Sequence, residues 1–330
     1  MAKPAVSLLP WLAAAALAAC APPAASGAPA PLVLERTIPL PGVTGRIDHL
    51  AFDPARGRLF VAELGNGTVE AVDVAAGKVA GRIGGLSEPQ GLAVLSTGEL
   101  AVANGGDGAV RFFRLADLAP LARLPLGPDA DDERVDAAGH LVVGYGAGAL
   151  ATIDPASRRV LSTIALPAHP EGFQVAGPRA YVNLPDAGGI GVADPASGKL
   201  AATWPNRGRR WNFPLAVDPQ SGAVAVVYRL PARLVLLDAA SGAELQALPT
   251  CGDADDLFFD PHRPRLYVSC GDGHVDVLVR QGSRWTRLAL VATGPGARTS
   301  LYEASTDRLY VAARAQGGRA AAILVYRPSS

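Results

Sequence analysis

The sequence has no excess of either charge, because 30 Lys and Arg residues balance 30 Asp and Glu residues. This balance predicts no general attraction to nucleic acids or to anionic membrane surfaces. After the N-terminal region, no segment approaches the ~20 apolar residues that a membrane-spanning helix requires. The sequence also contains no GxSxG, HExxH, Walker A or CxxCH motif. We therefore expect neither a nucleic-acid partner nor the enzyme classes that these motifs mark.

Tryptophan is also scarce, with only Trp204, Trp211 and Trp285 beyond residue 30. This scarcity argues against a large stacked redox cofactor. Residues 207–213 (RGRRWNF) gather three arginines around Trp211, a composition that can grip a phosphate or a nucleic-acid base. A solvated loop whose arginines pair with nearby acids is the better interpretation for a chain without net positive charge.

The first 19 residues have the features of an export signal: a basic start at Lys3, an apolar stretch over residues 6–17 and small residues before Cys20. Residues 17–20 (LAAC) resemble the lipobox of bacterial lipoproteins, which implies that Cys20 is lipidated. Residues 20–30 then form a tether rich in Pro and Ala. We expect an exported lipoprotein that faces the periplasm at the outer membrane and touches the membrane through its lipid alone. The alternative is an ordinary signal peptide and a secreted protein.

Cysteine is limited to three residues, so a lipidated Cys20 leaves Cys251 and Cys270. Disulfides persist in exported proteins, which favours a bridge between them. The expected hairpin register places Cys270 opposite about Asp256, so Cys251 must fold back to reach it. Two free thiols are the alternative.

A repeat of about 40 residues dominates the remaining sequence. Seven similar strand phrases recur, from LFVAE at 59–63 to LYVAA at 309–313, and their central valines are spaced 41, 41, 39, 44, 42 and 43 residues apart. Each unit contains four short apolar runs separated by turns rich in Gly and Asp, which predicts four antiparallel strands. The central valines are Val61, Val102, Val143, Val182, Val226, Val268 and Val311.

Seven four-stranded units predict an all-β fold, a seven-bladed β-propeller over residues 31–328. The last unit supplies only three strands before the chain ends. Residues 31–40 (PLVLERTIPL) match the fourth strand of other units, such as 159–167 (RVLSTIALP). The N-terminal strand is therefore expected to complete the last blade and close the ring.

The repeated LYV and AYVN phrases, the FDP turns and the GDG and GNG turns resemble the YncE-like β-propellers with YVTN repeats. Tyr181, Val182 and Asn183 match the name-giving tetrapeptide, whereas Leu184 departs from it. The resemblance covers residues 31–328. It implies an exported propeller of poorly defined activity that is similar in fold to quinoprotein propellers.

Aligning the seven units at the start of their first strands collects polar residues into two columns. Because first strands line the central channel of a propeller, these side chains are expected to gather at one mouth of it. The first column contains Asp48, Gln90, Asp131, Glu171, Phe213, Asp255 and Arg298; the second contains His49, Gly91, Asp132, Gly172, Pro214, Asp256 and Thr299.

Two interpretations of these columns stay open. Acids at strand starts often bind backbone N–H groups, which makes the ring structural. Alternatively the ring faces a ligand, since two acids ~10 Å apart repel by about 1.7 kcal/mol at an effective dielectric near 20 and need a counter-charge. Arg298 supplies one, and a cationic ligand or a divalent cation at Asp48, His49 and Asp255 would supply more.

The leading functional prediction is a binding or scaffolding module for an unidentified small ligand or protein partner. One alternative is a metal-dependent hydrolase or lyase with His49 or an acid as general base. A quinoprotein-like oxidoreductase is a further alternative that rests on fold analogy alone.

Overall fold

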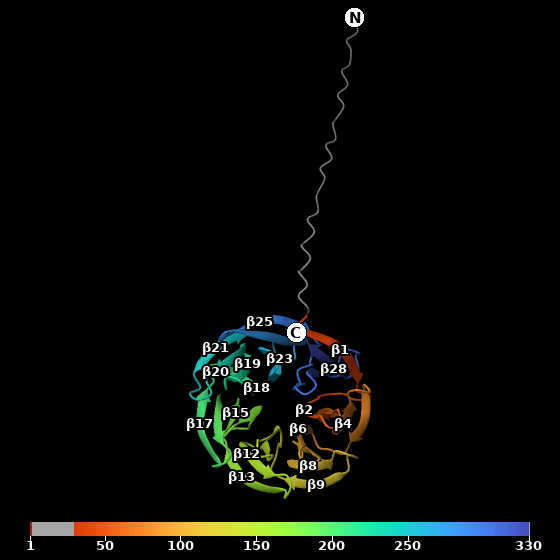
Figure 1. Ribbon diagram of the computed structural model, residues 1–330, viewed down its shortest axis with the longest axis vertical. Helices are drawn as coiled ribbons and strands as arrows, with labels where there is room; N and C mark the ends of the chain where they lie inside the picture. Colours follow the sequence, from red (N-terminus) through yellow and green to blue (C-terminus); the bar gives the residue numbers. More distant parts are fainter. Residues whose placement is uncertain (2–29, 330) are drawn as a thin grey trace.

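The computed structural model describes residues 1 and 30–329, which form 28 β-strands and one short 3-10 helix, η1 (Leu64–Asn66). The strands build seven four-stranded antiparallel sheets, arranged in a ring in sequence order (Figure 1). The predicted all-β, seven-bladed propeller is confirmed. The predicted signal peptide and the tether with Cys20 fall on residues 2–29, outside the described part. Among the described residues, no helix is long and apolar enough to cross a membrane.

Each blade contributes one strand to each of four concentric positions. The innermost strands are β2 (Leu50–Asp53), β6 (Pro89–Leu95), β10 (Glu133–Val135), β14 (Phe173–Ala176), β18 (Arg210–Val217), β22 (Ala254–Phe259) and β26 (Ser300–Glu303). The second strands are β3 (Arg58–Glu63), β7 (Glu99–Asn104), β11 (Leu141–Tyr145), β15 (Arg179–Leu184), β19 (Val224–Leu230), β23 (Arg265–Cys270) and β27 (Arg308–Ala313). The third strands are β4 (Thr68–Asp73), β8 (Ala109–Arg114), β12 (Ala149–Asp154), β16 (Gly189–Asp194), β20 (Ala232–Leu237), β24 (His274–Gln281) and β28 (Ala322–Pro328). The outermost strands are β5 (Lys78–Ile83), β9 (Pro120–Pro125), β13 (Arg159–Ala165), β17 (Lys199–Pro205), β21 (Glu244–Pro249), β25 (Arg284–Ala292) and β1 (Leu32–Pro39).

The N-terminal strand closes the ring as the sequence predicts. β1 pairs antiparallel with β28, from Leu32 opposite Pro328 to Pro39 opposite Ala322. Figure 1 shows β1 beside β28 at the point where the two ends of the ring meet. The last blade therefore combines strands from both ends of the chain, which removes a free sheet edge there.

The hydrophobic core lies between the blades. The described residues form seven buried apolar clusters, and each cluster joins side chains from two neighbouring blades. At the junction of the last and first blades, for example, Ile38 and Tyr310 pack with Leu50 and Val61. Burial of apolar area between blades is the main stabilising term of such a ring.

The seven central valines all lie on second strands, and each pairs with one residue of its blade's innermost strand. This common register relates the blades position by position and confirms the alignment of the repeats. The innermost partners are Leu50, Leu92, Glu133, Phe173, Leu215, Leu257 and Ser300.

Cys251 and Cys270 form a disulfide with their Cα atoms 5.9 Å apart. Cys270 pairs with Ala254 rather than with Asp256, because β22 bulges between Ala254 and Asp256. The extra residue in β22 brings the chain before Ala254 close to the end of β23. Cys251 therefore needs no long detour to reach its partner.

Candidate functional site

The first polar column surrounds a pocket where the innermost strands begin. We call its seven members the mouth ring. Six of them, all except Asp48, line a pocket of about 480 Å³. The blades thus bring together residues that are up to about 200 positions apart in the sequence. The six are Gln90, Asp131, Glu171, Phe213, Asp255 and Arg298.

A second set of residues lies two positions before the mouth ring in each blade, and we call it the rim ring. Four of its members also line the mouth pocket: Arg46, Glu88, Asp129 and His169. The column alignment of the sequence contains none of these four residues. Since alternate residues of an extended chain share a face, the same alignment shifted by two positions would have found them. The complete rim ring is Arg46, Glu88, Asp129, His169, Trp211, Asp253 and Gly296.

One half of the mouth consists of matched ion pairs. Arg298 lies 2.8 Å from Asp253 Oδ1 through Nη1 and 2.8 Å from Asp255 Oδ2 through Nε. Arg229, from the end of β19, contacts the same two carboxylates, 3.2 Å from Asp253 Oδ1. The Arg229 guanidinium also lies 3.9 Å above the centre of the Phe213 ring. Arg298 is thus a counter-charge within the ring, as expected, and Arg229 is a second that sequence reasoning missed. We call the four ion-paired residues the paired half: Arg229, Asp253, Asp255 and Arg298.

Asp48 is also matched, because Arg46 Nη2 lies 2.9 Å from its Oδ2 atom. Asp48 and Asp255 lie deeper than the acids of the rim ring. Their side chains are 3% and 16% exposed, against 56% for Asp129 and 45% for Asp253. The physical reason is that mouth-ring residues lie one layer deeper than the rim ring.

The other half of the mouth has more acids than bases, and we call it the acid half: Asp129, Asp131, His169 and Glu171. His169 Nε2 lies 3.6 Å from Asp131 Oδ2, and His169 Nδ1 lies 2.7 Å from the Gly146 carbonyl. Hydrogen bonding to Asp131 is the main reason that the pKa of His169 is raised to about 9. This single base faces three carboxyl groups.

In the described part of the chain, Glu171 is the acid of the mouth ring without a partner; Glu88 of the rim ring also has none, but it is exposed to solvent. Among residues 30–329 no group makes a hydrogen bond or ion pair with its side chain, although that side chain is half-buried in the pocket wall. Burial, reinforced by the charge of Asp131, raises the pKa of Glu171 to about 7. Burial also raises the pKa of Asp131. The acid half therefore holds carboxyl groups that resist ionisation until a positive charge approaches.

The second polar column is structural in part. The Asp256 carboxylate accepts a hydrogen bond of 2.6 Å from the backbone N–H of Ser300, at the start of the next blade. Asp132 accepts one of 3.5 Å from the N–H of Phe173 in the same way. These aspartates tie neighbouring blades together, which is the structural role considered above. Burial raises the pKa of Asp256 to about 7.

His49 occupies the same layer, with Nε2 3.8 Å from Asp132 Oδ1. Burial opposes its protonation, but the charges of Asp132, Asp48 and Asp256 outweigh burial and raise the pKa of His49 to about 9. His49 is thus a buried cation that partly neutralises the acids around it. Gly91, Gly172, Pro214 and Thr299 fill the remaining positions of this column.

Below this layer the innermost strands surround a cavity of about 640 Å³. Five blades place an apolar residue at the position that pairs with the central valine, whereas the third blade places Glu133 there. Both oxygens of this buried carboxyl lack a hydrogen-bond partner among the described residues. Burial raises the pKa of Glu133 well above its usual range, which favours the neutral form of the carboxyl group.

The residues suggested for a divalent metal do not form a ligand set. Within residues 30–329, the one group of three His, Cys, Asp or Glu residues with ligand atoms within 4.8 Å of each other contains Cys251 and Cys270, which form the disulfide. Asp48, His49 and Asp255 are not such a group. Each is directed to a different partner instead: Arg46, Asp132, and the pair of Arg229 and Arg298.

The arginines of residues 207–213 do not pair with the mouth acids. Arg209 forms an ion pair of 2.9 Å with Glu244 on β21 and lies over the Tyr228 ring. Arg229 and Arg298 take the role that was expected of this loop. Trp211 is 52% exposed, unlike Trp204 at 9% and Trp285 at 6%.

Comparisons with known proteins support the fold. No family model and no curated protein matches the chain. A chain of the solved structure titled "Crystal Structure of Mitotic Checkpoint Complex" is 15% identical, with a TM-score of 0.77 over 97% of this chain and 99% of that one. A chain of Kuenenia stuttgartiensis hydrazine synthase is 16% identical, with a TM-score of 0.74 over 87% of this chain and 98% of that one. At these identities the likeness establishes the β-propeller architecture alone.

Proposed function

We propose that this protein is an exported, lipid-anchored β-propeller that binds a cationic ligand at the acid half of its mouth. The observation that carries the proposal is the unpaired, half-buried carboxyl group of Glu171 beside Asp131. A protonated amine or guanidinium group placed between these acids would stabilise their ionised forms and donate hydrogen bonds to them. A basic peptide segment offers the same chemistry, so a small amine and a protein partner are both ligands of this kind.

The ion pairs of the paired half indicate which part of the pocket would bind the positive charge of a ligand. Asp253 and Asp255 already have Arg229 and Arg298 as partners, so an added cation gains least there. His169 is the base in contact with the acid half and balances part of its charge, and the charge of Arg46 also acts on Asp131 and Glu171. The uneven distribution therefore favours a single orientation for a cationic group within the pocket.

The export and anchoring part of the proposal rests on residues 1–30. The lipobox resemblance at 17–20 and the YVTN-like repeats both favour an exported protein held at a membrane by Cys20, with residues 20–30 as the tether. Changing Cys20 to Ser is expected to release the protein from the membrane fraction. Unchanged membrane fractionation of the Cys20→Ser protein would contradict the anchor.

Two enzymatic alternatives have less support. A metal-dependent hydrolase or lyase requires ligands that converge, and Asp48, His49 and Asp255 are each directed elsewhere. A quinoprotein-like oxidoreductase has only the resemblance of the repeats in its favour.

Calorimetric titration with spermidine, an aliphatic polyamine, tests the binding function. At pH 8 Glu171 is ionised, since its pKa is about 7, and the wild type is expected to bind spermidine. Glu171→Gln keeps the shape of the side chain and should weaken binding about tenfold, which corresponds to ~1.4 kcal/mol.

Asp117→Asn is the matched control, because Asp117 is an exposed acid paired with Arg114 away from the mouth. This variant should bind spermidine as the wild type does. Equal affinities of the wild type and the Glu171→Gln protein, or no binding to either, would overturn the proposal.

A further inference from the structure

A second, smaller pocket adjoins the mouth. Trp211, Phe213, Arg229 and Asp253 line this space of about 390 Å³, and Phe213 and Arg229 also line the mouth pocket. We call it the rim pocket. Trp211 is the aromatic residue that it exposes, with 52% of its surface accessible. An exposed indole beside a pocket presents a flat apolar face on which a ligand ring can stack.

The backbone of Trp211 has an unusual conformation for a bulky residue. Trp211 belongs to the rim ring, several of whose members have positive φ: 50° at Glu88, 54° at Asp129, 56° at Asp253 and 77° at Gly296. Aspartate and glycine tolerate this left-handed conformation, whereas a bulky aromatic residue is disfavoured there. Trp211 adopts φ 61° all the same. The fifth blade thus places a large ring in a conformation that four other rim-ring positions adopt with an acidic residue or glycine.

A buried amide network holds this conformation in place. Asn212 Nδ2 donates to Asn183 Oδ1 at 2.8 Å and to the Gly189 carbonyl at 3.0 Å. Asn206 Nδ2 donates to Asn212 Oδ1 at 2.7 Å. Asn212 is fully buried and held by these hydrogen bonds, so the backbone that adjoins Trp211 is held as well. Strain that the surrounding structure maintains in this way is typical of binding sites.

The neighbouring aromatic ring, that of Phe213, is already covered by an arginine. The Arg229 guanidinium covers Phe213 at 3.9 Å from the ring centre, and Arg229 is fixed by Asp253 and Asp255. The rim pocket therefore offers one free aromatic face, that of Trp211, beside a pocket whose acid half has more acids than bases. An aromatic face next to carboxylates suits a ligand that carries both a flat ring and a cation.

We propose that Trp211 is a stacking platform for a ring of the ligand, so that the ligand is an aryl-substituted amine whose cationic group lies in the acid half. The location of the cationic group rests on the proposed function, whereas the stacking role of Trp211 rests on the rim pocket. The column alignment of the sequence contains Asp131 and Glu171 but not Trp211.

Two amines of different shape test the platform by calorimetric titration at pH 8. Phenethylamine carries a flat ring and a cation, whereas butylamine carries the cation alone. The wild type should bind phenethylamine at least fivefold more tightly than butylamine. Trp211→Ala should weaken phenethylamine binding at least fivefold and leave butylamine binding within twofold of the wild type, while Trp211→Phe should restore most of the preference.

Fluorescence gives an independent readout. Trp204 and Trp285 are buried, so quenching of the protein's emission by acrylamide reports mainly on Trp211. Phenethylamine should protect the emission from acrylamide, and butylamine should not. Trp211→Ala is expected to fold normally, because alanine relieves the bulk in a left-handed turn.

The outcomes separate the two proposals. Equal affinity of the wild type for both amines, or unchanged phenethylamine binding in Trp211→Ala, overturns the stacking platform. In that case the proposed function is still tested independently, by whether Glu171→Gln weakens the binding of butylamine and spermidine. If Glu171→Gln changes neither amine while Trp211→Ala abolishes the preference, the ring site stands and the acid half is not where the cation binds.

Discussion

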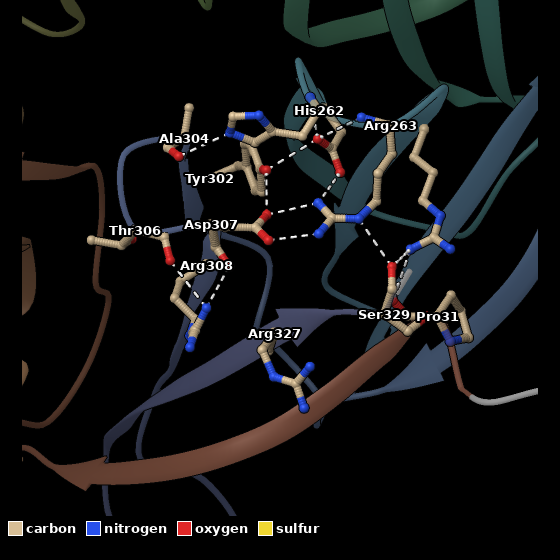
Figure 2. A network of polar contacts seen from close by, with 12 residues as sticks. Pro31, His262, Arg263, Tyr302, Ala304, Thr306, Asp307, Arg308, Arg327 and Ser329 are labelled. Atoms are coloured by element: carbon tan, nitrogen blue, oxygen red, sulfur yellow. Dashed lines mark hydrogen bonds and ion pairs between the residues drawn. The ribbon is translucent and has the colours of Figure 1, made fainter.

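Two clusters of charged residues lie at the two ends of the same innermost strand, β22, and their electrostatics are opposite. At its start, Asp255 belongs to the mouth, where Glu171 has no partner. Just after its end, Asp260 belongs to a second cluster, which we call the terminal clasp. Figure 2 shows this clasp around Arg263, Asp307 and Ser329.

In the terminal clasp every carboxylate has donors. Arg263 binds Asp307 through two hydrogen bonds of 2.7 and 2.6 Å and reaches the Ser329 carbonyl at 3.0 Å through Nε. Asp260 accepts hydrogen bonds from the backbone N–H of His262, from Arg263 and from the Tyr267 hydroxyl. The hydrogen bonds from Arg263 are the main cause that lowers the pKa of Asp307 to about 2.

The comparison distinguishes carboxyl groups that stabilise the fold through hydrogen bonds from a carboxyl group that has no partner. In the clasp, hydrogen bonds favour the ionised carboxylate, so the pKa falls; in the acid half, burial without a partner raises it, to about 7 at Glu171. The clasp holds Ser329 and, through Arg265, the Pro31 carbonyl at 3.3 Å, so it fixes both ends of the ring. The mouth keeps unfavourable charge interactions that a ligand would relieve.

The largest effect is expected from removing the strand that the clasp secures. Deleting residues 31–40 removes β1 and the buried side chains of Leu32, Ile38 and Leu40. β28 then becomes an unpaired edge, so the protein should aggregate or fail to accumulate as a folded monomer. Light scattering coupled to size exclusion checks this. A monomeric product with an unchanged melting temperature would show that ring closure does not depend on β1.

The next largest effect is expected within the clasp itself. Arg263→Ala leaves Asp260 and Asp307 without their shared cation and should cost about 3 kcal/mol of unfolding free energy, as loss of one partner of a buried ion pair does. Urea unfolding measures it. Arg284→Ala is the control, because Arg284 is exposed and makes no hydrogen bond or ion pair with the described residues. Equal losses in the two variants would refute the clasp.

The disulfide is expected to matter about as much for stability, but not for the acid half. Replacing Cys251 and Cys270 by Ser frees a loop with a sequence separation of 19 residues, which corresponds to about 3 kcal/mol in the chain-entropy account. Cys251 precedes Asp253 and Asp255 in the chain, so any increase in local mobility after loss of the disulfide would affect the paired half. Spermidine binding should therefore persist in the folded double variant. Loss of binding with little loss of stability would mean that the two halves of the mouth are not independent.

The sequence predicts the fold because the fold repeats. A period near 40 residues and the valine spacing determine the number of blades, and the missing fourth strand predicts the closing role of residues 31–40. Every blade confirms the same register, so errors at single positions do not accumulate. The mouth ring follows from the same alignment.

Pairing within the site could not be predicted, because it depends on residues outside the alignment columns. Arg229 lies on a second strand, yet it reaches Asp253 and Asp255. Arg46 pairs with Asp48 and buries it. Which acid is left unpaired, Glu171 rather than Asp48 or Asp255, therefore depends on side-chain geometry between blades, for which the sequence period carries no information.

The smallest predicted effect is the most direct test of the comparison, and it concerns pH. The pKa of Glu171 is about 7 in the folded protein and about 4.3 in an unfolded chain. Between these values the folded state binds more protons, so the contribution of Glu171 to stability falls as pH rises from about 4 to 7. His169, with a pKa of about 9, adds a stabilisation that is complete below about pH 6.5 and is lost as pH rises through 9. Asp307 acts oppositely: its stabilisation is present above about pH 4 and is lost as pH falls towards 2.

Glu171→Gln isolates the first of these contributions, because Asp131, Asp256 and Glu133 remain in both proteins. The variant and the wild type should be nearly equally stable at pH 4, where Glu171 is protonated in the folded state and mostly protonated in the unfolded state. At pH 8 the variant should be more stable by about 1 kcal/mol, a value reduced for partial solvent screening of the group. Urea unfolding at pH 4, 6 and 8 measures the difference. If the stability gain of the variant does not grow with pH, then the folded protein does not disfavour the ionised form of Glu171. The contrast between the mouth and the terminal clasp then fails at the residue on which the binding proposal depends.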